Sequence, residues 1–168
     1  MPKHVIEFPQ PVGMVASPDL QTAPVLDLMC SHFVLTLATK QGSRFNPRRD
    51  INGLMGLTGR HLIWPDQVLS RVRAFLARRC QENEVWRGHE QLSNDEFLKR
   101  HGVWRGPYEE GTLFYYLDEY TKDVHKDFLT LLTSTVQWLS LALKKQSTLV
   151  EKNIDTLANL LQLNKAER

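Results

Sequence analysis

The stretch LTLLTSTVQWLSLALKKQSTLVEKNIDTLANL, residues 129–160, decides the fold because its apolar residues recur at the spacing of a coiled coil. One series repeats every seven residues: Leu129, Val136, Leu143, Val150 and Leu157. A second series follows each of these three residues later: Leu132, Leu139, Gln146, Asn153 and Leu160. Eight of these ten positions are apolar. The pattern predicts a long amphipathic helix over residues 121–163, or two helices broken near Gln146 and Ser147.

The same heptad seam is the best candidate for a surface that binds a helical partner. Its candidate partner-binding residues are Leu129, Leu132, Val136, Leu139, Leu143, Val150, Leu157 and Leu160. Polar Gln146 and Asn153 weaken the seam, or they fix its register, a known use of a polar core residue. Folding back onto the chain's own core would use up the same seam, and the pattern does not choose between the two arrangements.

Further helices are predicted upstream of this stretch. The segment from Pro24 to Thr39 is apolar nearly all round, which is typical of a central core helix. A second helix begins at Asn46-Pro47, and a third is predicted from Pro65 to about Gln81. Ser93 and Glu96 form a capping box for a short helix, and the helical pattern resumes at Thr112, with Thr121 suited to cap the long helix after it.

Only weak signals for β-structure are present. Residues 1–16 contain three prolines and are expected to be an extended arm, in which Val5 to Phe8 suit one short strand. The sequence VWRG occurs at 85–88 and again at 103–106; the two copies either pair as short strands or match by chance. The expected fold class is therefore mainly α: a single-domain helical bundle over 1–168 with a long C-terminal heptad helix or helix pair. A small β element is an option, and a winged-helix-like arrangement is compatible with the helix from Pro65 to Gln81.

Composition and motifs argue against catalysis. The chain has 168 residues, of which 42% are hydrophobic and 24% charged, as in ordinary globular domains. The six histidines show no metal-ligand spacing, and we find no nucleophile elbow, phosphate loop or paired catalytic carboxylates. His89 and His101 flank the short helix and are able to meet in space. We expect no enzyme activity, no cofactor and no metal.

The location of the protein is inferred by elimination. No apolar stretch approaches the length that spans a bilayer, and the first residues do not resemble a signal peptide. The only cysteines, Cys30 and Cys80, are expected to be buried free thiols in a reducing compartment. The sequence thus predicts a cytoplasmic protein with no membrane partner.

Basic residues gather in the first half of the chain. Between Lys40 and Arg79 there are nine basic and two acidic residues, whereas between Glu82 and Asp127 there are eleven acidic and six basic ones. Arginine suits phosphate contacts, so the candidate nucleic-acid-binding residues are Arg44, Arg48, Arg49, Arg71, Arg73, Arg78 and Arg79. The alternative is a set of internal ion pairs with the acidic second half.

One resemblance bears on function. Taken with the size and helical make-up of the chain, the region Asn46-Pro47-Arg48-Arg49 resembles the small middle components of three-part ABC/SMC-like ATPase systems. Bacterial anti-plasmid and antiviral (anti-phage) defence complexes of the Lamassu type are the example. The resemblance implies a non-catalytic subunit that bridges an SMC-like ATPase and an effector nuclease near DNA, and it assigns no site residues. The leading expectation is an accessory subunit bound to a larger coiled-coil ATPase; the alternative is a stand-alone regulator that binds duplex DNA.

Overall fold

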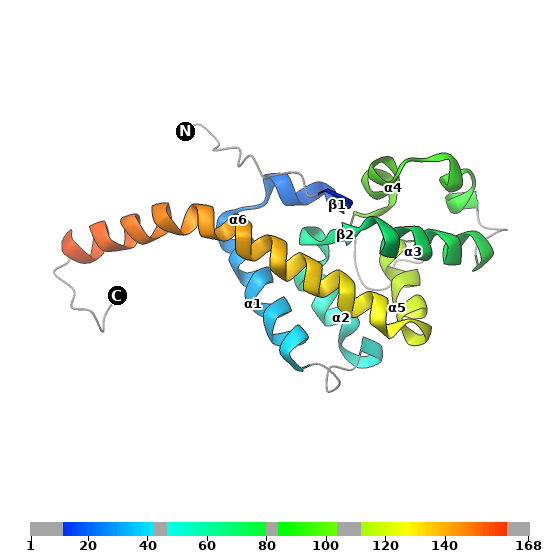
Figure 1. Ribbon diagram of the computed structural model, residues 1–168, viewed down its shortest axis with the longest axis horizontal. Helices are drawn as coiled ribbons and strands as arrows, with labels where there is room; N and C mark the ends of the chain where they lie inside the picture. Colours follow the sequence, from blue (N-terminus) through cyan, green and yellow to red (C-terminus); the bar gives the residue numbers. More distant parts are fainter. Residues whose placement is uncertain (1–11, 42–46, 80–83, 104–111, 161–168) are drawn as a thin grey trace.

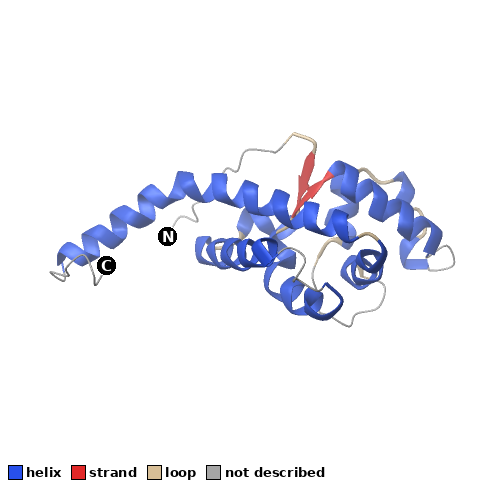
Figure 2. Ribbon diagram, turned by 60° about the horizontal axis from the view of Figure 1, so that its bottom comes forward, coloured by secondary structure: helices blue, strands red, loops and turns tan. Residues whose placement is uncertain are grey.

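The computed structural model describes residues 12–41, 47–79, 84–103 and 112–160, and for residues 41, 47–52, 85, 123 and 145–160 it describes the backbone alone. Helices dominate these ranges, as the sequence predicts (Figures 1 and 2). In chain order the elements are β1 (Met14–Ala16), η1 (Pro18–Thr22), α1 (Val25–Gln41), α2 (Pro47–Thr58), η3 (Gly59–His61), β2 (Ile63–Pro65), α3 (Asp66–Arg79), η4 (Glu84–Trp86), η5 (His89–Gln91), α4 (Asn94–His101), α5 (Leu113–Asp123) and α6 (His125–Leu160).

The long helix α6 organises the molecule. It is one continuous helix of 36 residues, which confirms the one-helix alternative and gives a rod of about 54 Å at 1.5 Å per residue. Its first half lies across the body, and its C-terminal end projects from it (Figure 1). The helix begins after Val124, not at Thr121. Thr121 lies inside α5 and donates its hydroxyl to the carbonyl of Asp118, so its expected role as a cap is wrong.

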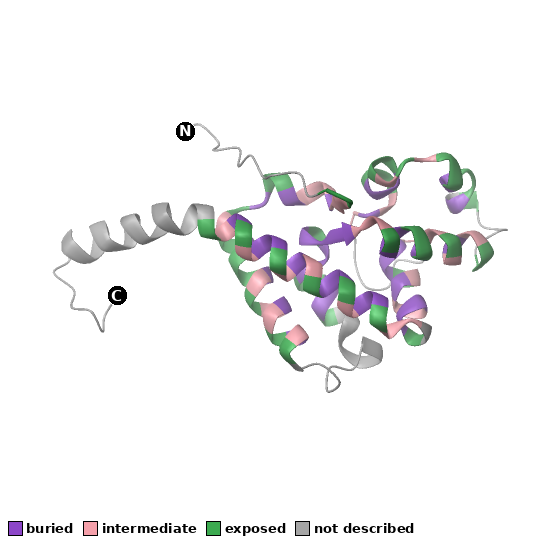
Figure 3. Cartoon of the chain, viewed as in Figure 1, coloured by how far each residue is buried: buried purple, intermediate pink, exposed green. Residues whose placement is uncertain are grey.

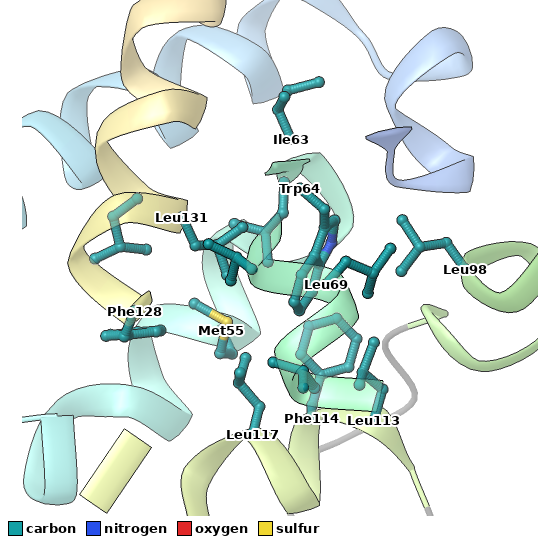
Figure 4. Packing of buried hydrophobic residues seen from close by; sticks show 14 of the residues in the cluster. Met55, Ile63, Trp64, Leu69, Leu98, Leu113, Phe114, Leu117, Phe128 and Leu131 are labelled. Atoms are coloured by element: carbon teal, nitrogen blue, oxygen red, sulfur yellow. The ribbon is translucent and has the colours of Figure 1, made fainter. Parts of the chain in front are cut away.

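The hydrophobic core gathers where α2, α3, α5 and α6 meet around β2. Trp64 of β2 is completely buried there, and Figure 4 shows it among side chains from several helices. Phe128 and Leu131 of α6 are at most 1% exposed. Trp64 and Trp86 are both core residues.

The sheet differs in place from the expected β element. β1 and β2 pair antiparallel, with Val15 opposite Trp64. The backbone N–H of Ile63 donates to Oγ1 of Thr135 at 3.0 Å, which joins this sheet to α6. The strand pairing considered for the VWRG copies is wrong for the first, since Glu84–Trp86 form a 3-10 helix. Residues 104–106 and 5–8 lie outside the described residues.

The third helix begins one residue later than predicted, because Pro65 belongs to β2. Pro65 ends a strand, and the helix begins at Asp66 and ends at Arg79. A proline lacks the N–H that a ladder needs, so its place at a strand end is expected. A winged-helix arrangement requires strands after this helix, but the described residues that follow α3 form η4, η5 and α4.

Helix α1 is not the central core helix that its composition predicts. Leu28 and Leu35 on its inner face are fully buried, whereas Leu26 and Phe33 on its outer face are 69% and 63% exposed. The reason is that the described body covers only one side of α1, the side facing α6 and α2. Cys30 is likewise exposed, so its expected burial is wrong; Cys80 lies outside the described residues.

The predicted capping box is confirmed, and a second helix begins next to the residue at which the helical pattern resumes. Ser93 and Glu96 form the capping box of α4, in which each side chain bonds the backbone N–H of the other residue. Thr112 caps α5 by accepting the N–H of Tyr115. Such caps satisfy backbone groups that the first helical turn leaves unpaired.

Candidate protein-binding surfaces

The heptad seam of α6 is divided between the body and the projecting end. In the first half, Leu132 and Leu139 are fully buried, while Leu129, Val136 and Leu143 are only partly buried. The buried line also includes residues outside the seam: Phe128, Leu131, Thr135, Trp138 and Ala142. This half of the seam therefore packs on the chain's own core. The partly buried series, Leu129, Val136 and Leu143, lies at the edge of that contact.

The second half of α6 has a different setting. Val150, Leu157 and Leu160 belong to the end of the helix that extends beyond the body in Figures 1 and 2. Their side chains are outside the described residues, so the structure gives the course of the backbone here. The heptad pattern of the sequence continues along this end of the helix, whereas the body does not extend beside it.

The outer stripe of α1, which we define as Leu26, Met29, Phe33 and Leu37, is a second apolar surface. These side chains are 69%, 45%, 63% and 46% exposed. Because a helix turns by about 100° per residue, the stripe lies opposite the inner residues Leu28, Ser31, Leu35 and Ala38. Figure 3 shows exposed residues along this helix. The inner face packs on α6, where Nε2 of His32 lies 2.7 Å from Oγ of Ser140.

Two arginines of the predicted nucleic-acid site are paired inside the chain. Nε and Nη2 of Arg71 donate to the two carboxylate oxygens of Asp127 at 2.6 and 2.7 Å. Tyr120 donates its hydroxyl to the same carboxylate. The hydrogen bond from Arg71 holds the pKa of Asp127 below its usual value, and burial raises the pKa of Tyr120 to about 12. Arg79 pairs with Glu119 at 2.8 Å.

Arg73 is also committed to the fold. Its Nη2 donates to the carbonyls of His89 and Leu92 at 2.6 and 2.7 Å, and its guanidinium lies 5.0 Å from the ring centre of Phe97. Among the described residues, none pairs with Arg78, which is exposed. Arg44 lies outside the described residues, and the side chains of Arg48 and Arg49 in α2 do too. Most of the described arginines therefore bond carboxylates or carbonyls of the same chain. The pairs of Arg71 and Arg79 agree with the alternative of internal ion pairs between the basic and acidic halves of the chain.

A hollow beside α1 brings together acidic, basic, thiol and imidazole side chains. It has a volume of about 560 Å³ and is lined by residues that include Asp19, Asp27, Cys30, Arg60 and His61. Nδ1 of His61 lies 2.7 Å from Oγ of Ser31, and burial lowers the pKa of this imidazole. Ser31 is only 1% exposed and does not line the hollow, so its hydroxyl orients the ring and is not presented to a substrate.

The histidines that flank α4 do come together, as the sequence allowed. The ring of His101 stacks on Trp86 at 4.5 Å, and His89 lies edge-on to the same indole at 6.0 Å. Burial lowers the pKa of both, that of His101 to about 4. Within the described ranges, no three His, Cys, Asp or Glu residues are placed to hold a metal ion.

Comparison with known proteins adds no relative. The chain matches no family model, no curated protein and no solved structure. No helix in the part of the chain that is described is long and apolar enough to cross a membrane.

The outer stripe of α1 is the feature that sequence reasoning missed. Its signal was present, because Leu26, Met29, Phe33 and Leu37 follow one another at intervals of three or four residues, which places them on one face of a helix. The equally apolar inner face hid this signal, since a helix that is apolar on both faces gives no contrast between them.

Proposed function

We propose that this protein is a non-catalytic adaptor subunit that holds a helix of a larger coiled-coil ATPase along the projecting end of α6. The observation that carries the proposal is the continuation of one helix, with its heptad pattern, past the body that covers its first half. The resemblance to middle components of SMC-like defence systems supports this choice of partner, and would place the complex on plasmid or phage DNA.

The physical argument begins with the length of the projecting end. Residues 145–160 extend for about 24 Å at 1.5 Å per residue. A helix of that length is marginal in water on its own, because most helical stability in proteins comes from packing an apolar face. A partner helix that covers Val150 and Leu157 would supply that packing.

Polar residues within the seam favour one register of the two helices over non-specific association. Gln146 and Asn153 occupy seam positions, and a polar residue there costs stability but selects one alignment of the two helices. Lys145, Glu151 and Lys152 occupy the b and c positions of the heptad, which face away from a partner helix, so the choice of register rests on the two polar seam residues.

DNA contact by this chain alone has weaker support. Arg71, Arg73 and Arg79 already bind groups of the same chain, so a DNA phosphate would have to compete with those bonds. Among the described members of the predicted arginine site, Arg78 is the one with no such partner. A stand-alone DNA-binding regulator is therefore the less favoured function.

The test is purification of the tagged full chain from its native host, with partners identified by cross-linking and mass spectrometry. The informative variant is Val150→Glu with Leu157→Glu, and its matched control is Thr148→Glu with Asn159→Glu, which adds the same charge to the same helix outside the seam. We expect the seam variant to lower recovery of the coiled-coil ATPase by at least about tenfold, as loss of central interface residues does, while the control retains it. Undiminished recovery by the seam variant, or no coiled-coil partner for the unaltered chain, would contradict the proposal.

A further inference from the structure

Charged side chains of both signs line the hollow beside α1, yet they do not pair with one another. Asp19 comes from η1, Asp27 from α1 and Arg60 from η3. Within the described residues, none of the three forms an ion pair, whereas Arg71 and Arg79 both bond carboxylates. Unpaired charges of opposite sign around one hollow are available to an occupant that carries both signs.

His61 adds a neutral hydrogen-bonding group to this hollow. Its side chain is only 7% exposed, and burial lowers its pKa although Asp27 and Asp19 act to raise it. The Ser31 hydroxyl makes no other hydrogen bond in the described residues, so it donates to Nδ1 of His61. The ring proton then lies on Nε2, the nitrogen that is left for an occupant because Ser31 does not line the hollow. Arg60 and His61 thus offer neighbouring donors.

These groups favour a zwitterion over a simple ion. A cation alone would lie beside Arg60, and an anion alone would lie beside two carboxylates, which is unfavourable because like charges repel. No three His, Cys, Asp or Glu residues in the described ranges are placed to hold a metal ion. An ammonium group suits Asp19 and Asp27, whereas a carboxylate suits the guanidinium of Arg60 and the Nε2–H of His61.

The rest of the lining includes apolar side chains, those of Ala23, Pro24 and Leu57. The volume of about 560 Å³ lies within the range of small-molecule sites. We infer that this hollow binds a free α-amino acid with an apolar side chain, whose ammonium group bonds the two aspartates and whose carboxylate bonds Arg60 and His61. The inference does not depend on the proposed function, because no residue of α6 lines the hollow.

The experiment is isothermal titration calorimetry of the full chain with L-leucine, L-valine, L-methionine and L-phenylalanine. We expect at least one of them to bind. The tightest binder is then compared with its amine analogue, which lacks the carboxylate, and with its acid analogue, which lacks the ammonium group. Each analogue should bind at least about tenfold more weakly, because each loses hydrogen bonds between charged groups.

Substitutions assign the two ends of the ligand. Arg60→Gln should weaken binding of the amino acid by at least about tenfold and should not weaken binding of the amine analogue. Asp27→Asn should weaken binding of the amino acid and should not weaken binding of the acid analogue. Both residues are exposed, so the fold should tolerate the changes, and circular dichroism checks this. The matched controls Arg78→Gln and Glu90→Gln change exposed charges outside the hollow and should retain the affinity.

Cys30 reports where the ligand binds, because it lines the same hollow. In a chain that carries Cys80→Ser, a saturating amino acid should slow alkylation of Cys30 by a maleimide. No binding of any of the four amino acids would overturn the inference, and so would analogues that bind as tightly as the amino acid. Binding that survives both Arg60→Gln and Asp27→Asn, or that leaves the alkylation rate unchanged, would overturn it by placing the ligand elsewhere.

Discussion

The two faces of α1 carry the same kinds of side chain and have opposite surroundings. Leu28 and Leu35 are fully buried against the body, while Leu26 and Phe33, a turn or less away, are mostly exposed. The difference shows that an apolar helix face favours burial, but that its sequence does not specify which molecule buries it. The inner face is buried within the chain, whereas the described residues leave the outer face exposed.

The largest expected effect comes from truncating one residue on each face. Leu35→Ala should destabilise the fold by about 2–5 kcal/mol, because it removes buried methyl groups and leaves a cavity. Phe33→Ala should change the stability of the monomer by no more than about 0.5 kcal/mol, since its ring is largely in water. Urea unfolding at low protein concentration measures both. Equal losses would mean that the two faces are not distinct in solution.

The arginines show a similar contrast, because Arg71 bonds a carboxylate of the same chain whereas Arg78 is exposed. Arg71→Met should cost about 2 kcal/mol, because Asp127 is only 8% exposed and would lose a bidentate partner. Arg78→Met should stay within about 0.5 kcal/mol, as for other surface changes. Thermal unfolding of the two variants gives the comparison. If Arg71 proves as dispensable as Arg78, its pair with Asp127 contributes little to the fold and the guanidinium is available to phosphate.

This pair also changes how DNA binding should be tested. A variant at Arg71 weakens the fold as well as any phosphate contact, so a loss of binding would be ambiguous. Arg78→Glu avoids that problem. If the chain does contact duplex DNA there, this change should lower affinity and reduce the salt dependence by about one phosphate contact. Unchanged binding would exclude Arg78 from the contact.

A smaller effect is expected from acid at the cluster of Trp86, His89 and His101. The pKa of His101 is lowered from 6.5 to about 4 by burial, so the fold favours its neutral form. The stabilisation is complete above the ordinary pKa and is lost as pH falls from about 6.5 toward 4. His101→Phe keeps a ring on Trp86 and should remove a loss of the order of 1 kcal/mol across that window.

Urea unfolding at several pH values checks this effect. The variant and the unaltered chain should have similar stability at neutral pH and diverge below pH 6. Asp127 acts in a separate, more acidic window, because its lowered pKa makes the stabilisation present above its ordinary pKa of 3.8 and lost only as pH falls through the lower folded value. Parallel pH curves for the two proteins would show that His101 is not held neutral by the fold.

Local signals in the sequence predicted local structure well. The capping box at Ser93 and the heptads of α6 act over a few residues, so they could be read directly. The sheet could not, because Met14–Ala16 and Ile63–Pro65 pair over a long separation and each strand has only three residues. Its position depends on Thr135 of α6, which accepts the N–H of Ile63.

The candidate surfaces show the same limit. The charge pattern identified the arginines, but only the fold could reveal that Arg71 meets Asp127, which lies 56 residues away. Similarly, the even apolar character of α1 predicted burial on all sides, and the arrangement of α6 on one side decided otherwise. Periodicity specifies which residues share a face, whereas tertiary packing decides what that face contacts.

The most direct test of the central claim, that α1 buries one face and exposes the other, uses the exposed thiol of Cys30. In a chain that carries Cys80→Ser, the rate of Cys30 alkylation by a maleimide is compared with the rate in a second chain that carries Cys80→Ser, Cys30→Ser and Ser31→Cys, which moves the thiol to a residue that is 1% exposed. The account predicts that Cys30 reacts at close to the rate of a free thiol, whereas the thiol at position 31 reacts only when the chain unfolds. Equal rates at the two positions would contradict it.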